Sequence, residues 1–285
     1  MTITANTMTI NDRNTNPSIQ RPTLWNHWLA LPLMACALLL GLPAMAQAGS
    51  ETRAQGLHLL QPTLDAHGGL ERWKSYRSFE YRLDGFPLTP QVAETSHSSV
   101  DLWNRFNRIQ SKGYTVGWNG QQAWATPNPE AVGLPPRFYT LGSFYFIGMP
   151  FVFADPGVVL EEAGESTFRG KEYRVLRASY VTGVGHSDRD DYLLYIDPKT
   201  HRLALIDHSV TETGVERVTW IFDEWQRENG LLVPQTLTFY PGAPADQAPE
   251  DGAITTISEV KLGTKALDPS IYNPPKGAVI TSGAE

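Results

Sequence analysis

The hydrophobic positions of the chain first follow a helical period and then a period of two. Leu57, Leu60 and Leu64 recur three or four residues apart, which predicts an amphipathic helix. The glycine pair after His67 predicts the end of that helix, because glycine accepts the left-handed backbone conformation found at helix C-termini. A short second helix around Trp73 is expected to follow.

Downstream, apolar and polar residues alternate, which is typical of β-strands with one buried face. Phe79, Tyr81 and Leu83 fall on one face of such a segment. Residues 99–109, “SVDLWNRFNRI”, alternate in the same way and predict one further strand.

The remaining strands are separated by turn residues. In “VGWNGQQAWAT” we predict a hairpin that turns at Asn119 and Gly120, because both residue types tolerate positive φ. Further strands are expected in “EYRVLRASY”, “DYLLYID”, “RLALIDHSVT”, “VERVTWIFDEW”, “LLVPQTLTFY” and “AITTISEVKL”. About ten short strands joined by turns predict a mainly β (α+β) fold, an antiparallel sheet that curls into a sandwich or barrel.

Residues 138–157, “FYTLGSFYFIGMPFVFADPG”, interrupt the strands and do not alternate. They hold five of the eleven phenylalanines of the chain and a single charged residue, Asp155. A membrane span needs about 20 consecutive apolar residues, and this run is shorter and broken by glycine and proline. We predict a helical or irregular insertion that either plugs the core or covers the open side of the sheet and lines an apolar site.

The N-terminus predicts export. Arg13 and Arg21 precede the apolar run “LALPLMACALLLGLPAMAQA”, which closes in small residues as signal peptides do. We assign residues 1–48 to a signal peptide and residues 49–285 to a single domain. The only cysteine, Cys36, lies in a loose lipobox, “LMAC”, so a lipid anchor there is the alternative to cleavage.

Charge and motifs exclude several function classes. Without residues 1–48 the chain keeps 21 Lys and Arg against 29 Asp and Glu, a net charge of −8. This acidic balance disfavours nucleic acids and adhesion to anionic lipid by charge alone. The motifs G-x-G-x-x-G, Walker A, H-E-x-x-H, G-x-S-x-G and C-x-x-C are absent, so no cofactor is expected and binding is favoured over catalysis.

Histidines offer weak candidates for catalysis or metal binding. His67 is a candidate general base beside the glycine pair, although a histidine at a helix end more commonly serves as a cationic cap. His97, His201 and His208 lie on separate predicted strands, and nothing in their spacing indicates a zinc site. No metal site is therefore predicted.

The loop “GVGHSDRDDY” is the other weak candidate. His186, Asp188 and Asp191 are candidate acid–base groups for an enzyme that acts on an apolar substrate, and the aspartates could supply oxygen ligands to calcium. A solvated acidic turn is the plainer interpretation, because the loop lacks the glycine and the bidentate glutamate of an EF-hand.

Aromatic residues are the stronger evidence. A curled sheet with a separate aromatic insertion predicts an apolar ligand cavity, since ligand sites are concave and mainly apolar. The predicted ligand-binding residues are Trp103, Trp118, Phe144, Phe146, Phe151, Phe153 and Trp220.

Residues 55–275 resemble uncharacterised periplasmic families of the outer-membrane lipoprotein-sorting (LolA-like) superfamily. The motifs are “HGGLERWKSYRS”, “GWNGQQAW”, “PFVFADPGVVLEEAGE”, “DDYLLYIDPKT” and “NGLLVPQTLTFY”. The resemblance implies a half-open antiparallel β-barrel with an N-terminal helix, a lid-like helical insertion at residues 138–153 and an apolar cavity that accepts acyl chains. The sorting carriers have a lipid-contacting arginine on an early strand; Arg82, Arg105 and Arg108 lie on early strands here, and none aligns with it uniquely.

The predicted function is a periplasmic binding or carrier protein for a lipid, a lipoprotein or another hydrophobic ligand. We expect a monomer that does not bind nucleic acid. A transient protein partner in the envelope is compatible with this function. Two alternatives stay open: an enzyme that acts on an apolar substrate in the same pocket, and an envelope assembly protein that uses a sheet edge or aromatic patch.

Overall fold

The computed structural model describes residues 55–182, 189–211, 214–241 and 252–281, all within the compact unit Met45–Glu285. The predicted signal peptide, residues 1–48 with Cys36, lies outside the described residues, and so do His186 and Asp188. Among the residues that are described, no helix is both long and apolar enough to cross a membrane.

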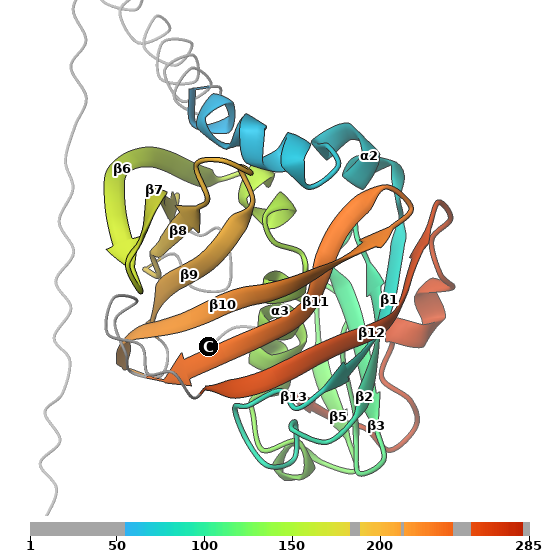
Figure 1. The fold of residues 1–285 in the computed structure, drawn as a ribbon. Helices are drawn as coiled ribbons and strands as arrows, with labels where there is room; N and C mark the ends of the chain where they lie inside the picture. Colours follow the sequence, from blue (N-terminus) through green and yellow to red (C-terminus); the bar gives the residue numbers. More distant parts are fainter. Residues whose placement is uncertain (1–54, 183–188, 212–213, 242–251, 282–285) are drawn as a thin grey trace, which may run out of the picture. The chain divides into compact units, whose positions relative to one another are not determined.

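The predicted mainly β fold is confirmed: the described residues contain one antiparallel, open and curved sheet of thirteen strands (Figure 1). The strands are β1 (Ser78–Asp84), β2 (Ser96–Asp101), β3 (Phe106–Ser111), β4 (Thr115–Trp118), β5 (Ala123–Thr126), β6 (Val158–Phe168), β7 (Lys171–Tyr180), β8 (Tyr192–Ile196), β9 (Leu203–Val210), β10 (Val215–Glu228), β11 (Leu231–Pro241), β12 (Ala253–Gly263) and β13 (Val279–Thr281). The helical segments are residues 55–66, α2 (Leu70–Ser75), α3 (Pro136–Ile147) and the 3₁₀ turns η1 (Pro129–Ala131), η2 (Phe151–Ala154) and η5 (Pro269–Tyr272).

Two runs of consecutive strands make up the sheet. Its order is β13-β5-β4-β3-β2-β1-β12-β11-β10-β9-β8-β7-β6. The run β1 to β5 and the run β6 to β12 are therefore joined where β1 pairs with β12, and β13 and β6 are the edge strands. Consecutive strands β5 and β6 lie near opposite ends of the sheet, and the chain between them forms α3 and η2.

The prediction of one continuous strand over residues 99–109 is wrong, because a turn divides this segment between β2 and β3. The carboxylate of Asp101 accepts hydrogen bonds from the backbone N–H groups of Trp103 and Asn104, both at 2.9 Å. Arg105 then adopts a positive φ of 59°. An aspartate that bonds the backbone two and three residues ahead favours a turn over an extended strand.

The hairpin of β4 and β5 is confirmed, but its turn differs from the predicted one. The N–H of Asn119 donates to the carbonyl of Gln122 at 3.2 Å, so Gly120 and Gln121 are the central residues. Gly120 has a φ of +89°, whereas Asn119 does not have a positive φ. The Asn119 side-chain oxygen instead accepts the N–H groups of Gln121 and Gln122.

The aromatic insertion is confirmed as helical and attaches to both runs of the sheet. Figure 1 shows α3 inside the curve of the sheet. The side-chain amide of Asn107 on β3 donates to the carbonyl oxygen of Thr140 at 2.7 Å, and both residues are buried. On the other run, Phe146 stacks on Trp220 of β10 with ring centroids 4.4 Å apart.

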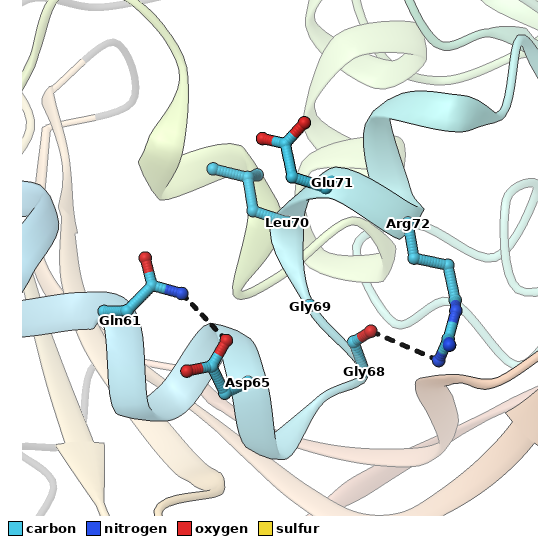
Figure 2. A pocket seen from close by; sticks show the side chains of 7 residues that line it. All are labelled: Gln61, Asp65, Gly68, Gly69, Leu70, Glu71 and Arg72. Carbon is cyan, nitrogen blue, oxygen red and sulfur yellow. Dashed lines mark hydrogen bonds between the residues drawn. The ribbon is translucent and has the colours of Figure 1, made fainter.

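The predicted N-terminal helix is confirmed, and its glycine pair ends it. Leu60 and Leu64 are fully buried. Gly68 and Gly69 have φ values of +109° and +96°, and their N–H groups donate to the carbonyls of Asp65 and Leu64, which is a Schellman motif. Figure 2 shows the chain turning at these glycines before α2.

Alanine at Gly68 should destabilise the protein more than alanine at Gly69. Both substitutions force a side chain into a positive φ, which costs about 1 to 3 kcal/mol. A Cβ at residue 68 would also lie 2.3 Å from the carbonyl oxygen of Gly230, whereas a Cβ at residue 69 meets no atom within 4 Å. Urea unfolding of both variants measures the difference, and equal losses of unfolding free energy would show that the contact with Gly230 is unimportant.

Candidate functional site

A cavity of about 980 Å³ lies between α3 and the strands β6 to β11. Its size is at the upper end of the range of about 300 to 1,000 Å³ that is typical of small-molecule sites. Most of its walls come from α3, from residues of the strands β6 to β11, and from the turn between β2 and β3, and Trp118 of β4 adds to them.

The sheet wall is a row of directly paired residues. Tyr192 on β8 is opposite His208 on β9, His208 is opposite Val218 on β10, and Val218 is opposite Pro241 on β11. Paired residues in an antiparallel sheet point to the same face. All four therefore face the cavity, and Tyr180 at the end of β7 extends the row, with its ring centroid 6.0 Å from that of Tyr192.

The helix wall is an apolar face of α3. Phe138, Leu141, Gly142 and Tyr145 line the cavity, and their spacing of three and four residues places them on one side of the helix. The opposite face of α3 packs into the core through Tyr139, Thr140, Ser143 and Ile147, which are all buried. The helix thus has one face buried against protein, and a second face, with Phe138, Leu141 and Tyr145, that lines the cavity.

A cluster of aromatic rings closes the base of the cavity. Trp220 is 1% exposed and stacks between Phe146, at 4.4 Å, and Phe86, at 5.5 Å. Phe239, opposite Trp220 in the sheet, adds a further ring at 4.7 Å. Rings packed in this way fix the shape of the wall, because each buries a large area against its neighbours.

The turn between β2 and β3 contributes a charged pair. Arg105 donates to both carboxylate oxygens of Asp155 at 2.6 Å, and both residues line the cavity. The pair joins the turn to the end of η2. Trp103, also in this turn, is 61% exposed and donates its indole N–H to the carbonyl oxygen of Tyr76 at 2.9 Å.

The structure brings together five of the seven aromatic residues that the sequence indicates for ligand binding. The residues that line the cavity are Trp103, Trp118, Phe144, Phe146 and Trp220. Phe151 and Phe153 are in the core instead. Phe151 stacks on Trp73 with centroids 4.7 Å apart, and Phe153 packs against Tyr145 at 5.7 Å. Whether any of the seven contacts a ligand stays a prediction.

Three tyrosines on the cavity wall were not singled out from the sequence. The hydroxyls of Tyr145 and Tyr180 are hydrogen-bonded to each other, and the ring of Tyr145 packs at 5.6 Å from that of Tyr192. Burial raises the pKa of all three phenols well above the ordinary value, so they stay neutral. Strand alternation could indicate that Tyr180 and Tyr192 are buried, but not that they face Tyr145 of α3.

His208 was considered only as a zinc ligand, and it lies in the cavity wall without the other two histidines. Its ring stacks on Tyr192 at 4.7 Å, and burial lowers its pKa to about 4. His97 is exposed on β2, and His201 is exposed in the turn before β9. In the described ranges, no group of three His, Cys, Asp or Glu side chains is placed to hold a metal ion.

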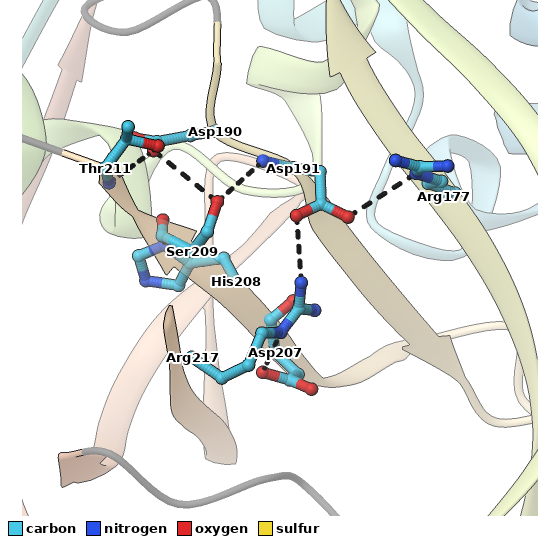
Figure 3. A network of polar contacts seen from close by, with 8 residues as sticks. All are labelled: Arg177, Asp190, Asp191, Asp207, His208, Ser209, Thr211 and Arg217. Atoms are coloured by element: carbon cyan, nitrogen blue, oxygen red, sulfur yellow. Dashed lines mark hydrogen bonds and ion pairs between the residues drawn. The ribbon is translucent and has the colours of Figure 1, made fainter. Parts of the chain in front are cut away.

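The acidic residues before β8 belong to a network of polar contacts (Figure 3). Asp191 lies between Arg217, at 2.9 Å, and Arg177, at 3.4 Å, and it does not line the cavity. Asp190 does line the cavity, and one of its oxygens accepts hydrogen bonds from the backbone N–H and the hydroxyl of Thr211 at 2.7 and 2.5 Å. These contacts anchor the start of β8 to β9 and β10.

The expectation that His67 is a cationic helix cap is wrong. The side chain is fully buried, and burial lowers its pKa to about 4, so the ring is neutral at pH 7. Its Nδ1 is 2.8 Å from the carbonyl oxygen of Thr63, and its ring packs against Trp225 with centroids 4.5 Å apart. It does not line the large cavity.

A smaller hollow of about 330 Å³ lies beside the glycine turn (Figure 2). Its polar groups already bond one another: Gln61 donates to Asp65 at 2.8 Å, and Arg72 donates to the carbonyl oxygens of Gly68 and Gly230 at 3.3 and 3.0 Å. This hollow lacks the apolar lining of the large cavity.

Comparison with known proteins gives one family model and several solved structures. The model of DUF6503, a family of unknown function, matches residues 137–236, which run from α3 to β11. No curated protein matches the chain.

The chain is similar in structure to a LolA superfamily protein from Nitrosomonas europaea, with 11% identity, a TM-score of 0.42 and coverage of 69% of this chain and 88% of that one. It is also similar to a DUF1329 family protein from Desulfovibrio piger, with 10% identity, a TM-score of 0.42 and coverage of 80% and 96%. A candidate outer membrane lipoprotein-sorting protein domain from Vibrio parahaemolyticus gives 12% identity, a TM-score of 0.41 and coverage of 78% and 97%. The predicted resemblance is thus confirmed as a structural similarity, which at these values says nothing about what this chain binds.

Acid should destabilise the protein through His67 and His208. Burial lowers the folded-state pKa of both to about 4, whereas an exposed histidine has a pKa of about 6.5, so between these values the unfolded chain binds more protons than the folded chain. The contribution of the two histidines to the free energy of unfolding is therefore fully present above pH 6.5. It falls as the pH drops toward 4, by about 1.4 kcal/mol per pH unit for each histidine.

Urea unfolding between pH 7.5 and 4.5 measures this slope. Replacing either buried histidine with glutamine (His67→Gln or His208→Gln) should reduce it, and His97→Gln, at an exposed position, is the control. A slope that neither buried substitution changes would contradict the assignment.

Proposed function

We propose that this chain is an exported binding or carrier protein for a hydrophobic ligand, a lipid or the acyl chains of a lipoprotein, held between α3 and the sheet. The observation that carries the proposal is the second apolar face of α3. A helix in a globular protein usually shows one apolar stripe toward the core and a polar face toward solvent. Here Phe138, Leu141 and Tyr145 direct a second apolar face into a cavity of about 980 Å³.

Apolar surface of this kind favours an apolar occupant. Each buried methylene contributes about 0.8 kcal/mol, so a dozen would supply roughly 10 kcal/mol before the entropic cost of binding. The contacts behind the cavity wall support the proposal further: Trp220 stacks with Phe146, and Asn107 holds α3 to β3, and a preformed wall lowers the entropic cost of binding.

Export is the second part of the proposal. It rests on the signal-like pattern of residues 1–48, whose cleavage places the carrier in the periplasm. The enzyme alternative draws no support from the described candidates, since neither His67 nor Asp191 lines the cavity.

Filling the cavity from Gly142 should block binding without disturbing the fold. Gly142 is in the middle of α3 and lines the cavity, and a Cβ there would meet no atom within 4 Å. We expect Gly142→Trp to weaken binding of diphenylhexatriene, an apolar fluorescent probe, about tenfold or more, because the indole takes up space that the probe needs.

Gly142→Ala is the matched control. It should leave probe binding near that of the wild type and raise the unfolding free energy by up to about 1 kcal/mol, because alanine favours a helix over glycine. If folded Gly142→Trp, checked by circular dichroism, binds the probe as the wild type does, the cavity is not the binding site.

A further inference from the structure

His208 supplies the imidazole in the paired row that forms the sheet wall, next to the phenol of Tyr192. Tyr192 flanks it on β8 and Val218 on β10, and Phe146 faces it from α3 with ring centroids 5.5 Å apart. The residue is 4% exposed and lines the cavity. A polar ring in this apolar wall needs an explanation, since buried polar groups usually have hydrogen-bond partners.

The ring has one satisfied nitrogen and one free nitrogen. Its Nδ1 is 2.8 Å from the carbonyl oxygen of Ser209. A carbonyl oxygen only accepts, so Nδ1 carries the hydrogen and Nε2 of the neutral ring presents a lone pair. In the part of the chain that the structure describes, Nε2 has no hydrogen-bond partner.

Burial, and not the neighbouring charges, keeps the ring neutral, because Asp190 and Asp191 raise the pKa of His208 whereas Arg217 lowers it. Asp190 lies before β8 and bonds Thr211, while Asp191 and Arg217 pair with each other at 2.9 Å. Figure 3 shows this network beside the ring. Burial lowers the pKa of His208 to about 4, and the raised phenol pKa of Tyr192 keeps that neighbour uncharged as well.

The chemistry of this site selects among apolar ligands. A neutral imidazole that presents a lone pair accepts a hydrogen bond but cannot neutralise an anion. A carboxylate has only acceptors to offer, and its charge would be costly to desolvate beside that lone pair. A hydroxyl matches the free nitrogen and remains uncharged.

We propose that the ligand is a long-chain molecule with an uncharged hydroxyl that donates a hydrogen bond to Nε2 of His208. The inference rests on the proposed function and names the chemical class of ligand within it. The apolar face of α3 accommodates the chain, and His208 sets the position of the hydroxyl along the sheet wall.

Displacement of diphenylhexatriene at pH 7.5 by three ligands of equal chain length tests the proposal. The ligands are 1-dodecanol, dodecyl methyl ether, which lacks a donor, and dodecanoate, which is charged. We expect the wild type to bind the alcohol about tenfold more tightly than the ether, as a hydrogen bond to an otherwise unsatisfied buried acceptor provides, and to bind dodecanoate more weakly than the alcohol.

Variants test whether Nε2 of His208 causes the preference for the alcohol over the ether. His208→Phe should abolish the preference for the alcohol and change binding of the ether little, whereas His208→Gln, which keeps an acceptor, should retain part of it. His67→Phe is the matched control. His67 is also buried, bonded to a carbonyl through Nδ1 and without a partner for Nε2 among the described residues, but it does not line the cavity.

Each outcome decides between the two proposals. If the wild type binds alcohol and ether equally, or binds dodecanoate best, the role of His208 is overturned while the carrier function stands. The same holds if folded His208→Phe and His208→Gln both keep the full preference. If none of the three ligands displaces the probe, the carrier function fails and this inference with it.

Discussion

The pairing of β1 with β12 is the constraint on which the rest of the structure depends. It is the only link in the described sheet between the run β1 to β5 and the run β6 to β12. The register shifts there: Glu80 is opposite Lys261 and Arg82 is opposite Ser258, so β12 has one extra residue, and Glu259 takes a positive φ of 52°. A bulge of this kind bends the strands and increases their twist, and the bend helps to give the sheet the concave face on which α3 lies.

The insertion lies on that concave face and is attached to the sheet near both of its ends. One end follows β5 and is fastened by Asn107 on β3, and the other precedes β6 and is fastened by Arg105 through Asp155. Between them, the stack of Phe146 on Trp220 ties the helix to the opposite run. The position of the cavity therefore depends on the topology: β5 and β6 are far apart in the sheet, so the chain between them has to cross it, and here α3 crosses on the concave side.

The types of most local elements could be predicted from the sequence, but the pairing of strands that are distant in the sequence could not. Period-two alternation gave the mainly β fold, and the glycine pair after His67 gave the end of the first helix. The aromatic run predicted the insertion and the wall residues Phe144 and Phe146, and the aromatic residues of the predicted strands added Trp220. Alternation misled at residues 99–109, because the side-chain turn of Asp101 overrides it. Tyr192 and His208 are 16 residues apart and meet only through the pairing of β8 with β9, which no local pattern encodes.

The edge strand β6 affects whether the sheets of two molecules can associate edge to edge. An open sheet exposes unpaired backbone groups at its edge, where another strand can add. Three of the five residues in the middle of β6 are charged: Glu161, Glu162 and Glu165 are exposed, and Gly164 adopts a φ of +85° within a shift of register. A second copy that added a strand here would bring like charges together along an irregular backbone. The edge thus opposes uncontrolled growth of the sheet from one molecule into the next.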